Sequence, residues 1–162
     1  MDSGYPVDRS RRVRERAAMA ALATMWAVAG WARWRLLPKS IPVHFGFNGQ
    51  PDTWGPVNQI FLMPALALGL YLALTVAVHF PQSFHYGVQV TEENRARLEA
   101  TAIQMIGWLK VVLVWVLAVL VAFQVLSATQ GTSSGIWMVV LLCFCAILGT
   151  VVWFLLALQR VG

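Results

Sequence analysis

The polar side chains that could take part in chemistry are concentrated in residues 37–55, LPKSIPVHFGFNGQPDTWG, between two long apolar runs. His44 could act as a base, Asp52 could orient it, and Ser40 is the nearby hydroxyl. Prolines flank Ser40 on both sides, a setting unlike the sharp turn that presents a catalytic serine. The set of groups is incomplete for hydrolysis, and we predict that the protein is not an enzyme.

A metal site is also incomplete in this stretch. Zinc sites usually take three or four protein ligands, whereas His44 and Asp52 supply two. His85 cannot complete the set, because it falls in a connection expected on the other side of the membrane. Cys143 and Cys145 lie in an apolar run, and on a helix they point about 200° apart, which excludes a shared disulfide or metal. We expect no metal, no cofactor and two small buried thiols.

The same stretch also has the pattern of a folded loop. Residues 41–45 suit a short extended segment, in which an edge proline is tolerated. Asn48-Gly49 is a strong signal for a tight turn, and Pro51-Asp52 predicts a second one. Val43, Phe45 and Phe47 alternate and would turn one apolar face toward the helix ends, while His44 and Asp52 would hydrogen-bond across the turn.

These patterns assign roles to individual residues of the loop. The residues expected to shape it are Pro38, Pro42, Gly49, Pro51 and Gly55. The residues expected to contact a ligand or partner are His44, Asn48, Asp52 and Trp54.

Composition indicates a membrane protein. The 162 residues are 59% hydrophobic and 12% charged, about half the charge of an ordinary soluble domain. The predicted fold is an all-α bundle, with a structured outer loop between the first two helices. We expect a basic tail at 1–16 and one transmembrane domain at 17–162, with helices at about 17–37, 60–80, 91–126 and 136–158.

The first apolar run has an alternative interpretation as a signal peptide. Arginines precede it, and Ala27-Val28-Ala29 before Gly30 has the small residues of a cleavage site. Trp26, Trp31 and Trp34 favour a helix that stays in the membrane.

Most lysines and arginines fall on one side of the predicted bundle. The basic tail, the connection between the second and third helices and the C-terminus share that side, which predicts cytoplasmic termini in the inner (plasma) membrane of a bacterium. Arg33, Arg35 and Lys39 run against this trend. No aromatic or glycine-rich RNA-binding pattern accompanies the basic tail, so we expect it to orient the first helix and touch anionic lipid rather than nucleic acid.

The third helix is predicted to project from the membrane. Thr91 suits its N-cap, with Glu92 and Glu93 at the positive end of the helix dipole. From Glu92 to about Leu126 the helix would be roughly 52 Å long, longer than a hydrocarbon core of ~30 Å.

Polar side chains inside the predicted spans are few. Thr75, Gln124 and Thr150 are uncharged, and Lys110 and Arg160 can reach the inner interface. No acidic residue falls inside a span, which disfavours active transport. The tryptophans Trp31, Trp34, Trp54 and Trp137 are expected at the outer interface, Trp108 at the inner one, and Trp115 and Trp153 between helices.

The loop at residues 37–55 resembles a known family. The pattern LPxxIPxHFxxxGxPDxWG over residues 37–55 is similar to that of domain of unknown function 1648, found at the N-terminus of SdpI-type immunity membrane proteins. A second segment, FHYGV followed by TEEN in residues 84–94, resembles the FNYPV-x-IT-x-EN signature of that family. Pro56-Val57 replace a usual lysine, His85 and Gly87 replace an asparagine and a proline, and the longer C-terminal part has no counterpart here. The resemblance implies a membrane protein without catalytic residues.

Three functional hypotheses follow. The first is a non-enzymatic membrane protein that binds a protein or ligand through its extracytoplasmic loop, in an immunity or signalling role. The second is a structural accessory subunit of a larger membrane complex, and the third is a transporter or membrane enzyme. The expected partners are the lipid bilayer and a membrane protein or second copy of the chain, without nucleic acid.

Overall fold

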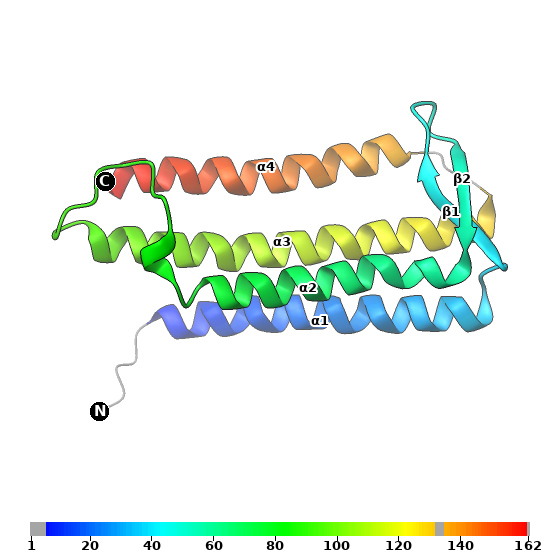
Figure 1. Cartoon of the computed structure of the whole chain (residues 1–162), viewed down its shortest axis with the longest axis horizontal. Helices are drawn as coiled ribbons and strands as arrows, with labels where there is room; N and C mark the ends of the chain where they lie inside the picture. The colour runs from blue at the N-terminus through cyan, green and yellow to red at the C-terminus, as the bar shows by residue number, and fades with distance from the viewer. Residues whose placement is uncertain (1–5, 132–134, 162) are drawn as a thin grey trace.

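The computed structural model describes residues 6–131 and 135–161, which form a helical bundle with a small β-hairpin at one end (Figure 1). The α-helices are α1 (Pro6–Arg35), α2 (Leu62–Ala77), α3 (Arg95–Gln130) and α4 (Ile136–Val161). The strands are β1 (Ser40–Phe45) and β2 (Pro51–Pro56), and the 3-10 helices are η1 (Val57–Phe61) and η2 (Pro81–Ser83). The connection between α2 and α3 lies at the end of the bundle opposite the hairpin.

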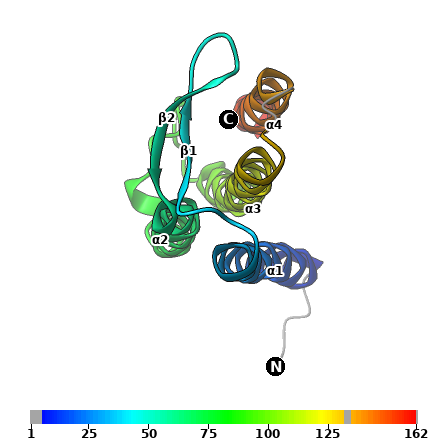
Figure 2. The same cartoon turned by 90° about the vertical axis from the view of Figure 1, so that its right-hand side faces the viewer.

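Helix α3 is the centre of the bundle and packs against α1, α2 and α4 (Figure 2). Its buried residues recur every three or four positions, the spacing that keeps side chains on one stripe of a helix. This stripe includes Leu98, Ala102, Ile106, Lys110, Val114, Leu117, Val121 and Val125. Lys110 is therefore a charged residue at a core position.

The described residues contain three helices that are long and apolar enough to cross a membrane, at Val57–Ala77, Arg95–Gln130 and Ile136–Arg160. The length and hydropathy of these helices indicate a membrane protein. Helix α1 is equally long, but alanines make up much of its apolar part and arginines occur near both ends.

Helix α1 begins at Pro6, so residues assigned to a basic tail form its first turns. Proline is favoured at the first helical position, and the arginines and Glu15 that follow are good helix formers. Farther along, the buried face of α1 is formed largely by Ala18, Ala21, Ala29 and Ala32. Small side chains of this kind let helix backbones approach closely inside a membrane.

The start of α3 differs from the prediction that Thr91 is its N-cap. Asn94 is the capping residue, and the helix begins at Arg95. Thr91 instead closes the preceding turn: its N–H donates to Asn94 Oδ1 (2.8 Å), and its Oγ1 accepts from the Asn94 N–H (3.3 Å). These are the reciprocal hydrogen bonds of a capping box, and the Arg95 N–H donates to the Thr91 carbonyl oxygen, so Thr91 caps the turn that leads into α3 although the helix itself starts later than predicted. At the other end, Gly131 stops the helix with a φ of 63°.

The two strands pair antiparallel, with Ile41 opposite Gly55 and Pro42 opposite Trp54. The predicted extended segment and the Asn48-Gly49 turn are confirmed, and Gly49 has a φ of 75°. The predicted second turn at Pro51-Asp52 is wrong, because both residues belong to β2. The Gly46 N–H donates to the Gln50 carbonyl oxygen, and the Gly49 N–H donates to the Gly46 carbonyl oxygen. The chain has therefore already reversed its direction before Pro51.

The base of the hairpin is held firmly on the helix ends. Ile41 is fully buried and belongs to the same apolar core as Val57 and Ile60. Gln124 of α3 donates from Nε2 to the Pro42 carbonyl oxygen at 2.9 Å. The strand irregularity on either side of His44 leaves only part of the expected apolar face against the bundle.

The three residues expected to form that apolar face differ in their contacts. Val43 packs against the core, and the Phe45 ring meets the Phe123 ring edge to face, with 5.7 Å between centroids. Phe47 is different: it stacks on Trp137 at the start of α4, yet 99% of its surface is exposed. The hairpin is thus buried at its base, while at its tip Phe47 and Asn48 are exposed and Gly49 is buried against Ile136 and Trp137.

Several residues expected inside the bundle lie on its surface. Trp115 and Trp153 are at least half exposed, so their predicted packing between helices is wrong. Cys143 is partly buried, Cys145 is exposed, and both are free thiols, so the expected buried pair is also wrong. In a membrane protein such apolar surface can face lipid, which removes the pressure to bury it.

Candidate functional site

The hairpin carries a hydrogen-bonded pair formed by His44 and Asp52. His44 Nδ1 lies 2.6 Å from Asp52 Oδ1, which confirms the contact expected across the turn. Thr53 Oγ1 donates to the same carboxylate oxygen at 3.2 Å. The His44 hydrogen bond is the main cause that holds the pKa of Asp52 below its ordinary value. Both side chains are exposed, so the pair is available to a binding partner.

The other residues expected to contact a ligand occupy different positions. Asn48 Oδ1 accepts the Gln50 N–H at 3.0 Å, so its side chain shapes the turn. Trp54 is more than half exposed and lies two residues from Asp52 on β2, a spacing that places alternate side chains on one strand face. Together with Phe47, Trp54 gives the exposed surface an aromatic character.

The prolines and glycines of the loop have structural positions. A Cβ added to Gly55 would lie 3.0 Å from Val43 Cγ1 and closer still to the Gln59 side chain, so a larger residue there would have to displace Gln59 and shift Val43. Pro42 is buried beneath the hairpin, and Pro51 begins β2. Pro38 is exposed in the connection from α1 to β1.

The His44–Asp52 pair resembles the base and orienting group of a hydrolase, but the nearby serine does not join it. Ser40 pairs with Pro56 at the base of the hairpin, and its Oγ donates to the Gly55 carbonyl oxygen at 3.3 Å. Within residues 6–131 and 135–161, no group of three His, Cys, Asp or Glu side chains could hold a metal ion. The arrangement offers charge, hydrogen bonds and aromatic rings to a partner.

The depressed pKa of Asp52 predicts an acid-sensitive hairpin. Because the folded pKa is below the ordinary value, the pair stabilises the hairpin above about pH 4 and is lost as pH falls through the folded pKa. Hydrogen-exchange protection of residues 40–56, corrected for intrinsic exchange, should drop over that acidic range. An Asp52→Asn variant should have lower protection and no such step, and an identical step in that variant would contradict the assignment.

A second polar cluster joins α1, α2 and α3 at a distance from the hairpin. Lys110 is only 1% exposed. Its Nζ donates to Glu15 Oε1 at 2.5 Å and to Thr75 Oγ1 at 3.1 Å, and lies 4.7 Å from the centre of the Tyr71 ring. Tyr71 in turn donates its hydroxyl to Glu15 Oε2 at 2.9 Å. The cluster of Glu15, Tyr71, Thr75 and Lys110 therefore links one residue pair on α2 to single residues on α1 and α3.

The predicted extension of Lys110 to the inner interface is wrong, because Glu15 meets the ammonium inside the bundle. One sequence signal could have revealed the cluster: Lys110 follows Ile106 by four residues, in step with Leu98 and Ala102. No comparable signal selects Glu15 as its partner.

Residues 20–68 match the family model described as domain of unknown function DUF1648. This segment is a DUF1648 domain. It runs from α1 through the hairpin into α2, and so contains the His44–Asp52 pair, Asn48 and Trp54. The family predicted from the motif over residues 37–55 is confirmed.

The DUF1648 match leaves most of the chain outside it. Glu15, Tyr71, Thr75 and Lys110 all fall beyond the matched residues, as does the second motif at 84–94. No curated protein and no solved structure matches this chain significantly. The matched segment therefore includes the hairpin and the adjoining parts of α1 and α2, whereas the buried cluster lies outside it.

Proposed function

We propose that this protein is a non-enzymatic, four-helix plasma-membrane protein that binds a protein or ligand through its outer hairpin. The observation that carries the proposal is the contrast within that hairpin. Its base is locked to the bundle by Ile41 and Gln124, whereas its tip presents the His44–Asp52 pair and the exposed ring of Phe47. A rigid support beneath exposed aromatic and charged groups lowers the ordering cost of binding.

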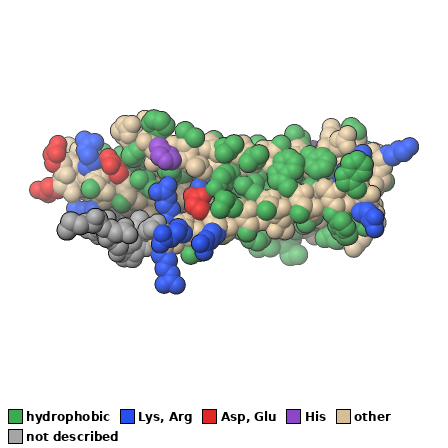
Figure 3. Space-filling view, turned by 90° about the horizontal axis from the view of Figure 1, so that it is seen from below, with side chains coloured by type: hydrophobic (Ala, Val, Ile, Leu, Met, Phe, Trp, Pro, Cys, Tyr) green, Lys and Arg blue, Asp and Glu red, His purple; other side chains and the backbone are tan. Residues whose placement is uncertain are grey.

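The charge distribution supports an outward-facing hairpin. Lysine and arginine side chains gather around the end of α1 remote from the hairpin, with apolar side chains along the middle of the molecule (Figure 3). By the positive-inside rule, that basic end faces the cytoplasm of a bacterium together with both termini. Arg33, one of the basic residues against the trend, donates from Nε to Asn58 Oδ1 at 2.8 Å, which explains its place near the hairpin.

Helix α1 is proposed as the fourth transmembrane helix. Its central part lies beside α3, which is itself long and apolar enough to span. At 1.5 Å per residue, α1 is roughly 45 Å long, enough to cross a hydrocarbon core of ~30 Å with its arginines outside. An immunity or signalling role is the specific form that the family resemblance suggests for such a protein.

The proposal is tested by partner recovery from native membranes. Full-length tagged protein, extracted gently, should co-purify with a defined partner, and a Phe47→Ser/His44→Ala variant should recover at least tenfold less of it. Leu141→Ala, which changes an exposed residue of α4, is the matched control and should retain the partner. Recovery of the same partner at wild-type level by the tip variant, with unchanged thermal stability, would exclude the hairpin as the binding surface.

A second candidate function is that of a structural subunit in a larger membrane complex. The exposure of α4 favours this candidate. This helix packs mainly on α3, and only 6% of its most apolar stretch is buried. A neighbouring subunit could cover that surface. Mass determination of the gently extracted particle separates the two, since a subunit that needs its complex would not be recovered as an 18.0 kDa protein.

A further inference from the structure

A groove follows the face of α3 that lies between α1 and α4. Trp108 and Trp115 project from this face two helical turns apart, and both are about half exposed. On the α4 side of Trp115, an apolar cavity of about 450 Å³ is lined by residues such as Val112, Val116 and Leu142. On the α1 side, a smaller one of about 220 Å³ is lined by Met25, Val28 and neighbouring residues of α3. The groove is therefore almost wholly apolar along its middle.

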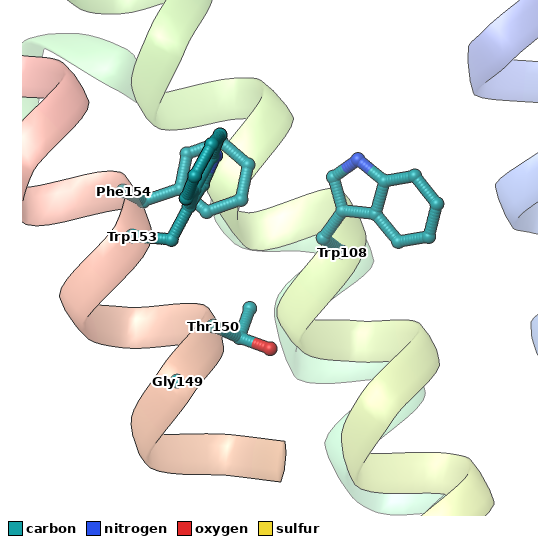
Figure 4. A pocket seen from close by; sticks show the side chains of 5 residues that line it. All are labelled: Trp108, Gly149, Thr150, Trp153 and Phe154. Carbon is teal, nitrogen blue, oxygen red and sulfur yellow. The ribbon is translucent and has the colours of Figure 1, made fainter.

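At Trp108, toward the basic end of α1, the lining of the groove changes from mainly aliphatic to aromatic and basic side chains. One cavity there, of about 470 Å³, lies between α3 and α4 and is lined by Trp108, Gly149, Thr150, Trp153 and Phe154. Figure 4 shows the Trp108 ring directed away from α4, with Trp153 and Phe154 on the other side of the opening. A second cavity, of about 360 Å³, lies between α1 and α3 and is lined by Arg9, Ser10, Val13, Arg14 and Trp108. An aromatic cavity and a basic cavity thus share one side chain.

Arg14 is held in place within the basic cavity. It is only 6% exposed, and its guanidinium lies 5.7 Å from the centre of the Trp108 ring. Its Nη1 donates to Ser10 Oγ at 3.3 Å, while its Nε is buried without a hydrogen-bond partner. The neighbouring carboxylate of Glu15 accepts from Lys110 and Tyr71 instead. A buried guanidinium in this state favours an additional anionic oxygen nearby.

Gly107 makes room for this arrangement. A Cβ added there would lie 2.9 Å from Arg14 Nε, so a larger residue would displace the guanidinium from α3. Gly149 differs, because nothing lies within 4 Å of a Cβ added there and this glycine lines open space in the aromatic cavity. Gly107 thus lets Arg14 lie close against α3, and a larger side chain at position 149 would enter the aromatic cavity.

We propose that this groove binds an anionic phospholipid of the cytoplasmic leaflet. Arg9 and Arg14 hold the headgroup phosphate, and an acyl chain lies against Trp108, Trp153 and Phe154. Arginine matches phosphate in charge and in hydrogen-bond geometry. A phospholipid accounts for both cavities at once, whereas a free phosphate would leave the aromatic cavity unused. This proposal is independent of the hairpin and of its partner.

The test compares lipids by native mass spectrometry of the detergent-solubilised full-length protein. Phosphatidylglycerol should bind at least tenfold more tightly than phosphatidylcholine with the same acyl chains. An Arg9→Gln/Arg14→Gln variant should bind the two lipids equally. Arg11→Gln/Arg16→Gln, which removes the same charge from exposed positions on α1, should keep the preference. Equal binding of both lipids by the wild type, or equal loss in both double variants, would overturn the proposal.

Two further measurements test the proposal even if Arg14→Gln impairs folding. Gly149→Leu, which fills the aromatic cavity, should weaken the binding of both lipids several-fold. The preference for phosphatidylglycerol over phosphatidylcholine should stay unchanged. Inorganic phosphate at millimolar concentration should not displace bound phosphatidylglycerol. Unchanged lipid binding in Gly149→Leu, or full displacement by inorganic phosphate, would show that the site does not take a phospholipid in this groove.

Discussion

Glu15→Gln is expected to destabilise the protein by about 3 kcal/mol or more, because it leaves the Lys110 ammonium buried without a counter-charge. Thr75 Oγ1 and the Tyr71 ring would remain near Nζ, but neither carries a negative charge. At about 2–4 °C per kcal/mol for a chain of this size, the thermal midpoint should fall by about 6 °C or more. Thermal unfolding in mild detergent, followed by circular dichroism, measures the change.

Removing the Lys110 charge should lower the stability of the protein less than removing the Glu15 charge does. This difference tests the buried ion pair more sharply than either variant alone. Lys110→Met leaves Glu15, whose side chain is 29% exposed and can turn toward water. The double variant Glu15→Gln/Lys110→Met should return close to wild-type stability, since replacing a whole buried ion pair by apolar or neutral groups is often nearly neutral. If Glu15→Gln alone has no effect, or if the double variant is less stable than either single one, the buried ion pair does not hold the three helices as described.

Ile41→Ala is expected to loosen the hairpin from the bundle. Ile41 is completely buried, and truncating such a side chain costs about 2 kcal/mol or more through lost apolar contact and the cavity left behind. The thermal midpoint should fall by about 4 °C or more. Trypsin should also cleave faster after Lys39, which lies two residues before Ile41 in the same connection.

Two variants calibrate that measurement. Ile41→Val removes a single methylene and should cost about 1 kcal/mol. Phe47→Ala changes the exposed tip of the same hairpin and should leave both the thermal midpoint and Lys39 cleavage unchanged. Equal effects of Ile41→Ala and Phe47→Ala would mean that the hairpin base is not anchored in the core.

Local sequence signals predicted the parts of the fold whose causes are local. Apolar length indicated the helices, and the Asn48-Gly49 dipeptide indicated the hairpin turn with its positive φ. Locating that turn brought His44 and Asp52 close together on facing strands, and the two side chains are hydrogen-bonded. The motif over residues 37–55 identified the family for the same reason, since its spacing records the geometry of one short hairpin.

The remaining features depend on contacts between distant segments. Lys110 and Glu15 are far apart in the chain, and only the packing of α1 on α3 shows that they meet. Phe47 is exposed because it lies in the turn beyond the end of β1, so the alternation of apolar residues along the strand does not extend to it. Trp153 was misplaced because a large aromatic side chain inside a span suits either a helix contact or lipid. The basic cavity around Arg14 likewise needs Gly107 and Trp108 from another helix.

The most direct test of the proposed binding surface is photo-crosslinking in living cells. A photoreactive phenylalanine analogue is placed at Phe47, the exposed tip of the hairpin, and in a parallel strain at Leu141 on the exposed face of α4. A discrete, ultraviolet-dependent adduct from position 47, absent from position 141 and lost when His44→Ala and Asp52→Ala are added, is the predicted result. The absence of any adduct at position 47, or an equal one at both positions, would contradict binding through the hairpin.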